Sequence, residues 1–297
     1  MAERFIDGTY VFQPAETEAV QEKYLDLKYM AGERHDLDIY LPNTGARPFP
    51  VIIDIFGGGL WRGEKSSFKL NPALQILENG YAVVSINYSL IWQQHFPTQI
   101  YEVKAAIRWL RANGAKYGLD MNRVALMGES SGAHLAALAG VSASVNELSN
   151  PQFGEAPDEP ETVNAIIALY GPYAFDHFVE QFKESQTTPK YAETGTAESF
   201  EGQMFGKQAP KDMPELVKRY NPATYFNPKM PPILGFAGTA DQVVPYQQTI
   251  NMIEKAQTVI GDKAELVLVE GAGHGIAGFM DEANTALKVK FLDHYVK

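Results

Sequence analysis

The chain has 297 residues, a formal net charge of −11 and a hydrophobic fraction of 45%, which together predict a globular protein with a substantial core. The acidic residues are spread along the chain and argue against nucleic acid as a partner. The absence of cysteine excludes disulfide bonds, thiolate metal sites and a cysteine nucleophile. The first residues lack a basic start and an apolar core, and no apolar run approaches the roughly 20 residues that span a bilayer. We therefore expect a cytoplasmic protein without membrane contact.

The first part of the chain is predicted to alternate strands with helices. After a polar arm that ends near Gln21, segments 24–29 and 36–41 alternate apolar with polar residues, which is typical of paired antiparallel strands. The β-branched run 51–56 is typical of a strand buried on both faces. Apolar runs and helical spacing predict the next elements: a helix over 72–79, a strand over 81–88, a helix over 98–113, and a strand over 123–127 that leads to a helix over 133–139.

The second part of the chain has the same alternation with one interruption. A surface loop over 151–161 and a strand over 165–170 precede it, and segment 173–228 then breaks the pattern with aromatic, glycine and polar residues. We expect this segment to be a small lid insertion that folds over the edge of the sheet. The alternation resumes with a strand over 232–238, a helix over 246–260, a strand over 264–269 and a helix over 279–296.

Strands that alternate with helices predict an α/β fold. Such a chain forms a mostly parallel, twisted sheet with helices on both faces and right-handed crossovers. We expect residues 1–297 to form a single domain of this kind, with the insertion as its only large departure.

The stretch Gly-Glu-Ser-Ser-Gly at 128–132 lies between a predicted strand and a predicted helix. A serine at such a turn is held in a strained conformation, and the flanking glycines remove Cβ atoms that would collide there. The hydroxyl of Ser130 then stands clear of the sheet, and the backbone N–H of Ser131 points at the same spot. Ser130 is therefore a candidate nucleophile. The alternative is a turn made of small residues for packing.

Two further residues follow predicted strands at the same edge of the sheet. Asp241 comes just beyond the strand that ends near residue 238, and His274 lies among glycines after the strand that ends near residue 269. The order serine, aspartate, histidine is that of the catalytic triad in α/β-hydrolases. A serine hydroxyl needs an imidazole to take its proton, and a carboxylate orients the imidazole.

Each of these assignments has an alternative. Asp241 could instead cap a turn or helix, which would leave Glu270 or Asp281 as the orienting carboxylate. His134 competes with His274 as the base, but it falls in the first turn of the helix after Ser130 and more naturally supports that turn.

The glycines at 57–59 leave a buried strand and predict a tight turn or a close approach to a ligand. Their N–H groups and that of Ser131 are the expected donors to an oxyanion. Glu129 is interpreted as a hydrogen-bonding partner of the turn at the substrate pocket, rather than as a base. Trp61 is expected to line the acyl pocket, with a place in the core as the alternative.

With these residues in view, the sequence resembles α/β-hydrolase fold esterases related to hormone-sensitive lipase and to the feruloyl and acetyl-xylan esterase-like (BD-FAE-like) group. The resemblance covers most of the chain outside the first 20 residues and the insertion. The matching stretches are 56–63, 87–90, 96–97, 105–123, 128–135, 238–241, 244–245 and 273–275.

The resemblance implies roles for particular residues. It makes Ser130 the nucleophile, Asp241 the orienting acid and His274 the base. It also implies that the oxyanion donors are the N–H groups of Gly58, Gly59 and Ser131. One residue departs from the family pattern, because Phe56 stands where the family usually has a histidine that hydrogen-bonds the glycine loop. Packing of Phe56 must then hold this loop, or the oxyanion hole is less rigid.

We therefore expect a serine carboxylesterase that acts on short-chain acyl esters, including acetylated sugars or aromatic esters, through an acyl-enzyme. Its partner is a small-molecule ester, and no cofactor or metal is expected. The Gly-Gly-Gly-Leu-Trp stretch also resembles the motif of kynurenine formamidases, which makes an aryl formamide an alternative substrate. The other alternative is a non-catalytic small-molecule binding protein on the same fold. A homodimer through the last strand or helix is compatible with the fold.

Overall fold

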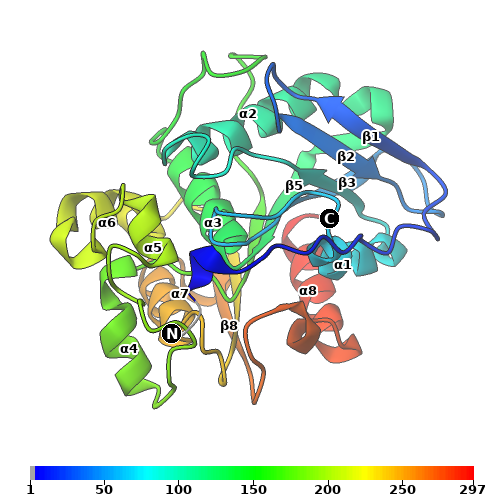
Figure 1. Cartoon of the computed structure of the whole chain (residues 1–297). Coiled ribbons are helices and arrows are strands. Elements are labelled where there is room, and N and C mark those ends of the chain that lie inside the picture. Colours follow the sequence, from blue (N-terminus) through cyan, green and yellow to red (C-terminus); the bar gives the residue numbers. More distant parts are fainter. Residues whose placement is uncertain (1–3) are drawn as a thin grey trace.

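The computed structural model describes residues 4–297 and contains an eight-stranded sheet with the strand order β1-β2-β4-β3-β5-β6-β7-β8 (Figure 1). The hairpin of β1 (Lys23–Lys28) and β2 (Asp36–Tyr40) is antiparallel, and β2 also pairs antiparallel with β4, its other neighbour in the sheet. The remaining pairs are parallel and join β3 (Phe49–Ile55), β4 (Ala82–Ile86), β5 (Leu119–Glu129), β6 (Ala165–Leu169), β7 (Ile233–Gly238) and β8 (Ala264–Val269). The predicted mostly parallel sheet is confirmed.

Helices cover both faces of this sheet. Successive residues of a strand point to opposite faces, and accordingly Ile53 of β3 belongs to one hydrophobic cluster and Ile52 to another. The first cluster packs against α2 (Thr98–Asn113), α3 (Ser131–Ala143) and α7 (Gln247–Ile260). The second packs against α1 (Asn71–Leu74) and α8 (Glu282–Tyr295). The expected two-sided α/β arrangement is therefore confirmed.

Element boundaries differ from those predicted where tertiary contacts override local pattern. The expected helix over 72–79 is α1 followed by a 3-10 turn over Gln75–Asn79. Helix α3 continues to Ala143, four residues beyond the predicted end, and all of its residues are buried. Its alanines and glycine allow this close packing: a Cβ on Gly140 would lie 2.6 Å from the Ile166 side chain of β6. None of the helices in residues 4–297 has the length and hydropathy needed to cross a membrane.

The segment over 173–228 forms three short helices with turns between them (Figure 1): α4 (Phe178–Glu184), α5 (Phe200–Met204) and α6 (Pro214–Tyr220). Its aromatic residues pack on one another. The ring of Phe178 lies 6.4 Å from that of Phe182 and 5.9 Å from that of Phe200, and all three side chains are buried. The segment thus has an aromatic cluster of its own, which joins the hydrophobic cluster that contains α3.

The N-terminal arm, residues 4–21, lies along the body of the protein in a defined conformation (Figure 1). The N–H of Phe68 donates to the carbonyl of Gln13 at 2.8 Å, and the N–H of Ala15 donates to the carbonyl of Ser66 at 2.9 Å. Arg62 donates to the carbonyl oxygens of Phe5 and Gly8. Bonds to a distant part of the chain, rather than a helix or strand of its own, set the conformation of the arm. Its sequence accordingly has no regular pattern.

Candidate active site

Ser130 occupies the sharp turn between β5 and α3, with φ 54° and ψ −125°. A positive φ is unfavourable for a residue with a side chain and is kept only where the surroundings enforce it. Here the N–H of Ser130 donates to the carbonyl of Leu169 at 2.8 Å. A Cβ on Gly132 would lie 1.9 Å from the carbonyl oxygen of Ile55, and one on Gly128 would lie 2.4 Å from that of Gly132. Both glycines are therefore required by the turn, as their spacing predicts.

Asp241, His274 and Ser130 form a continuous chain of contacts. His274 Nδ1 lies 2.7 Å from Asp241 Oδ2, and His274 Nε2 lies 2.9 Å from Ser130 Oγ. The other oxygen of Asp241 accepts the N–H groups of Val243 at 2.8 Å and Val244 at 2.9 Å. Asp241 thus caps a turn, as the alternative interpretation expects, and also contacts the histidine. The three predicted residues, 144 and 33 positions apart in sequence, are brought together.

The tautomer of His274 follows from its two partners. An ionised carboxylate can only accept, so Nδ1 carries the hydrogen that Asp241 receives, which leaves Nε2 to accept from the Ser130 hydroxyl. The imidazole ring also meets the ring of Tyr170 edge-on, with centroids 4.9 Å apart. The carboxylate and this aromatic contact both fix the plane of the ring. The arrangement can move a proton from Ser130 to His274.

The glycine loop lies next to Ser130. Gly58 has φ 131° and Gly59 has φ 64°, and a Cβ on Gly58 would lie 2.0 Å from the carbonyl oxygen of Arg62. Both glycines line the same cavity as Ser130 and His274. The N–H groups of Gly58, Gly59 and Ser131 donate no hydrogen bond within residues 4–297. These three donors remain available for a ligand.

Glu129 contacts the glycine loop through its carboxylate. Its carboxylate, 4% exposed, accepts the N–H of Gly57 and lies 3.1 Å from Lys69 Nζ. The expectation that Glu129 serves as a structural hydrogen-bonding partner fits this geometry, but its carboxylate bonds the glycine loop rather than the turn at Ser130. Its placement in the substrate pocket does not fit, because the buried carboxylate is not among the residues that line the cavity.

Phe56 secures the same loop by packing. Its ring is 1% exposed and stacks on Tyr88 with centroids 4.3 Å apart, and the Tyr88 hydroxyl donates to the Phe56 carbonyl at 2.6 Å. This stacked pair is the packing that the sequence predicts would hold the glycine loop.

The cavity in front of Ser130 has a volume of about 310 Å³. Trp61 does not line it, which differs from its predicted place; its ring is half-buried against the core and its carbonyl accepts from Trp92 Nε1 at 3.0 Å. The lining that sequence reasoning missed comes from the N-terminal arm, the glycine loop and the segment over 173–228. It includes Phe5, Tyr10, Arg62, Lys190, Tyr191 and Phe200. The scattered aromatic residues of the arm and insertion are a sequence signal for the aromatic members of this lining, and nothing in the sequence indicates Arg62 and Lys190.

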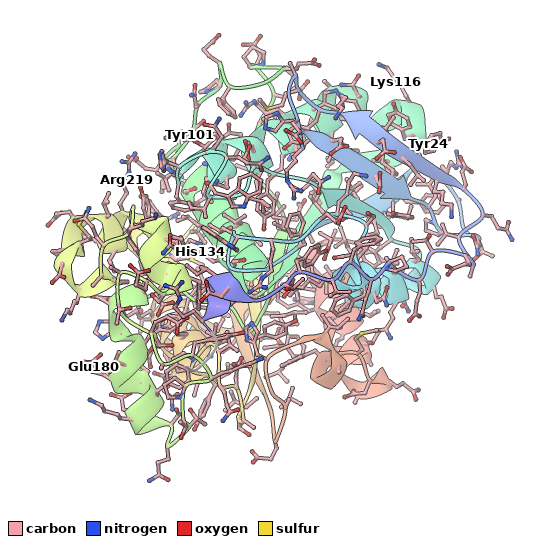
Figure 2. All side chains as sticks on the ribbon, viewed as in Figure 1. Tyr24, Tyr101, Lys116, His134, Glu180 and Arg219 are labelled. Atoms are coloured by element: carbon pink, nitrogen blue, oxygen red, sulfur yellow. The ribbon has the colours of Figure 1, made fainter. Side chains whose placement is uncertain are left out.

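The alternative site residues lie elsewhere. His134 is fully buried in α3 (labelled in Figure 2), and its Nε2–H donates to the carbonyl of Tyr220 at 2.7 Å. It therefore ties α3 to α6, rather than supporting the turn as predicted, and burial lowers the pKa of His134 to about 4. Asp281 caps α8 through the N–H of Asn284 at 2.8 Å, and Glu270 is exposed. Within the described residues, no group of three or more acidic or histidine side chains is arranged to hold a metal ion.

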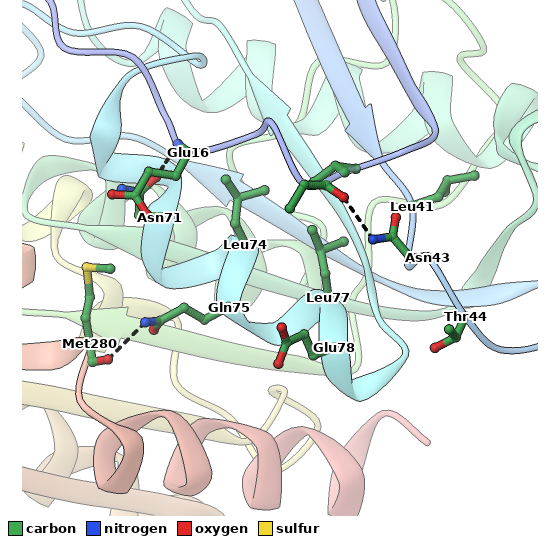
Figure 3. A pocket seen from close by; sticks show the side chains of 12 residues that line it. Glu16, Leu41, Asn43, Thr44, Asn71, Leu74, Gln75, Leu77, Glu78 and Met280 are labelled. Atoms are coloured by element: carbon green, nitrogen blue, oxygen red, sulfur yellow. Dashed lines mark hydrogen bonds between the residues drawn. The ribbon is translucent and has the colours of Figure 1, made fainter.

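A second cavity, of about 430 Å³, lies between the N-terminal arm and α1 (Figure 3). Several of the polar groups that line it bond to one another. Asn71 Oδ1 accepts the N–H of Glu16 at 2.9 Å, and Gln75 donates to the carbonyl of Met280 at 3.0 Å. None of the residues near Ser130 lines it. It is distinct from the candidate active site.

The BD-FAE family model matches residues 37–256. The chain belongs to the BD-FAE family. Esterase LipC of Mycobacterium tuberculosis is 30% identical over 80% of this chain and 56% of its own length. Probable isoprenylcysteine alpha-carbonyl methylesterase ICMEL1 of Arabidopsis thaliana is 29% identical over 81% of this chain and 48% of its own length. The chain thus spans about half the length of the curated relatives it matches.

Solved structures share the fold of this chain. A truncated form of a carbohydrate esterase from gut microbiota is 29% identical and superimposes with a TM-score of 0.83, covering 95% of this chain and 99% of that chain. A carboxyl esterase from the fungus Tuber melanosporum, at 19% identity and a TM-score of 0.74, shares the fold. The expected α/β-hydrolase fold of this BD-FAE family member is confirmed.

Proposed function

We propose that this protein is a serine carboxylesterase that hydrolyses short-chain acyl esters through an acyl-enzyme. The observation that carries the proposal is the chain of contacts from Asp241 through His274 to Ser130, which ends at a cavity beside three unengaged backbone N–H groups. The printed names of the matched relatives, which include esterases and a carbohydrate esterase, support the same reaction class.

In the proposed acylation step, Ser130 Oγ attacks the ester carbonyl carbon while His274 Nε2 takes its proton. The carbonyl oxygen becomes an oxyanion and receives hydrogen bonds from the N–H groups of Gly58, Gly59 and Ser131, each worth about 3 to 4 kcal/mol of barrier. Collapse of the tetrahedral intermediate breaks the bond to the alcohol, which leaves with the proton from His274. Asp241 keeps the hydrogen on Nδ1 and stabilises the charged imidazole.

In the proposed deacylation step, His274 takes a proton from water as the water oxygen attacks the acyl-enzyme carbonyl. The second oxyanion uses the same three donors. Its collapse releases the carboxylic acid and returns the proton to Ser130.

The size of the cavity favours small acyl groups. Its volume of about 310 Å³ is at the lower end of ligand pockets, which commonly have 300 to 1,000 Å³. We assign the segment over 173–228 as the lid, because Lys190, Tyr191 and Phe200 from it line the cavity. Acetyl, propionyl and butyryl esters of sugars or aromatic alcohols are the proposed substrates.

The test is hydrolysis of nitrophenyl acetate, butyrate and octanoate from about pH 5 to 9. We expect the rate to fall with chain length and to disappear in Ser130→Ala. Ser149→Ala, a loop serine outside the site, is the matched control and keeps full activity. An active Ser130→Ala protein would refute the assignment.

Two further measurements separate this proposal from its rivals. A fluorophosphonate probe should label Ser130, whereas a non-catalytic binding protein stays unlabelled. Faster hydrolysis of N-formylkynurenine than of any nitrophenyl ester would favour an aryl formamidase.

A further inference from the structure

The cavity in front of Ser130 has a charge opposite to that of the whole chain. The chain carries a formal net charge of −11, yet Arg62, Lys69 and Lys190 line this cavity and no aspartate or glutamate does. A cleft lined by one sign of charge concentrates ligands of the other sign, because its low-dielectric walls focus the field.

Two of these cations have no acidic partner. Lys69 lies 3.1 Å from the Glu129 carboxylate, which offsets its charge. Arg62 and Lys190 have no carboxylate within 4.0 Å among residues 4–297. Carbonyl oxygens orient the Arg62 guanidinium but do not neutralise it.

Side-chain contacts hold Arg62 in place, and a backbone hydrogen bond positions Lys190. The Arg62 guanidinium lies over the ring of Phe5 at 4.3 Å and donates to the carbonyl of Gly8 at 2.6 Å, which holds it at the wall made by the N-terminal arm. The backbone N–H of Lys190 donates to the carbonyl of Gln242 at 2.7 Å, which places it beside the loop that carries Asp241. Its ammonium lies 5.4 Å from the Tyr191 ring. The Arg62 guanidinium is therefore anchored at the cavity, whereas the Lys190 side chain is exposed and is positioned there through its backbone.

Aromatic rings supply much of the remaining wall. Phe5 meets Phe200 with ring centroids 5.3 Å apart and Tyr191 at 5.5 Å, and all three line the cavity. A flat apolar group can pack on such rings, while a carboxylate on its edge reaches a lysine or a guanidinium through charge-assisted hydrogen bonds.

We infer that the substrate is an ester with a negatively charged carboxylate on an aromatic or other apolar group, bound through Lys190 and Arg62. This inference rests on the proposed esterase function and names its substrate class. The carboxylate can belong to the alcohol part or to the acyl part of the ester. In either position it is recognised by the same two cations, Lys190 and Arg62.

The test uses two pairs of esters that differ only in charge. One pair places the charge on the alcohol: 3-acetoxybenzoate and its methyl ester. The other places it on the acyl group: mono(4-nitrophenyl) adipate and its methyl ester. We expect the charged member of one pair to be preferred about tenfold in kcat/KM. The pair that shows the preference identifies which part of the substrate carries the charge.

Variants at Lys190 test the cause of that preference. Lys190→Met should lower the ratio of charged to neutral ester about threefold, and Lys190→Glu should abolish it. Lys183→Met, an exposed lysine of α4 that does not line the cavity, should leave the ratio unchanged. Raising the ionic strength from about 0.02 M to about 0.5 M should also reduce the preference in the wild type.

The outcomes separate this inference from the esterase proposal. If both neutral esters are hydrolysed by a Ser130-dependent reaction and neither charged ester is preferred, the inference is wrong and the esterase remains. If no ester is hydrolysed, calorimetry with Ser130→Ala decides. Tighter binding of 3-acetoxybenzoate than of its methyl ester, weakened by Lys190→Glu, would support the inference alone, and equal binding would overturn it.

Discussion

At the residue scale, we expect the buried Glu129 to influence the proposed catalysis without touching the substrate. Its carboxylate accepts the N–H of Gly57, the residue before the two proposed oxyanion donors of the loop. In Glu129→Ala this N–H loses its acceptor, and a buried donor left unsatisfied costs about 1 to 3 kcal/mol. We expect a lower urea midpoint and a kcat on nitrophenyl acetate lower by about tenfold, less than the effect of removing an oxyanion donor.

The control for this prediction is Glu254→Ala, an exposed glutamate of α7. It should change neither the midpoint nor kcat. A Glu129→Ala protein with full kcat would show that packing of Phe56 on Tyr88 is sufficient to hold the glycine loop.

The two histidines near the turn should have opposite phenotypes. His274→Ala should remove fluorophosphonate labelling with little loss of stability, because the ring is partly exposed at the cavity. His134→Ala should keep the labelling and lower the free energy of unfolding by about 2 kcal/mol, because it breaks a buried bond to Tyr220 and leaves a cavity. Labelling and urea unfolding measure the two effects. A folded His134→Ala protein without labelling would contradict this separation.

At the scale of elements, the segment over 173–228 contains an unusual buried acid. Glu201 in α5 is fully buried, its Oε1 accepts the N–H of Gly195 at 2.7 Å, and its Oε2 has no partner among the described residues. Burial raises the pKa of the Glu201 carboxyl to about 7. The folded protein therefore holds this proton at pH values where the unfolded chain, with an ordinary glutamate pKa of about 4.3, has lost it.

The raised pKa makes Glu201 more favourable to folding at low pH than at high pH. The contribution of the protonated Glu201 to the free energy of unfolding is fully present below about pH 4.3 and is lost as the pH rises to about 7. The upper bound of this contribution is about 4 kcal/mol. Glu201→Gln is neutral at every pH and keeps the acceptor for Gly195. We expect it to be more stable relative to wild type at pH 8 than at pH 5, measured by urea unfolding.

Glu180→Gln in α4 serves as the control, because this glutamate is exposed (labelled in Figure 2). It should show no such difference between the two pH values. The same result for Glu201→Gln would mean that the Glu201 carboxylate is ionised in the folded protein across this range.

Most elements of the sheet are predictable because their signals are local. The run of β3 is apolar except for Asp54 because both of its faces are covered, and the apolar spacing of α2 gives its observed ends, Thr98 and Asn113. The helices α4, α5 and α6 have five to seven residues, too few to show a period. Their stability comes from packing of aromatic rings, which no short window of sequence contains.

At the scale of the whole molecule, the N-terminal arm completes the cavity from outside the part of the chain that the family model matches. Phe5 lies over Gly59, where a Cβ would come within 2.6 Å of its ring. Phe5→Ala should widen the cavity, and we expect the ratio of octanoate to acetate hydrolysis to rise roughly threefold or more. Rates on the two nitrophenyl esters measure this ratio.

Phe12→Ala is the matched control, because Phe12 belongs to the same arm but is 46% exposed and does not line the cavity. It should leave the ratio unchanged. An unchanged ratio in Phe5→Ala as well would show that the arm does not limit acyl length.

The parallel sheet, the turn at Ser130 and the order of Ser130, Asp241 and His274 could all be derived from the amino-acid sequence. Each depends on a local pattern together with one general rule, that the carboxyl ends of parallel strands meet at one edge. The contacts of Phe5, Arg62 and Lys190 around the cavity depended on the tertiary structure. These residues come from loops far apart in the chain, and their side chains meet only because the sheet and its helices hold those loops together.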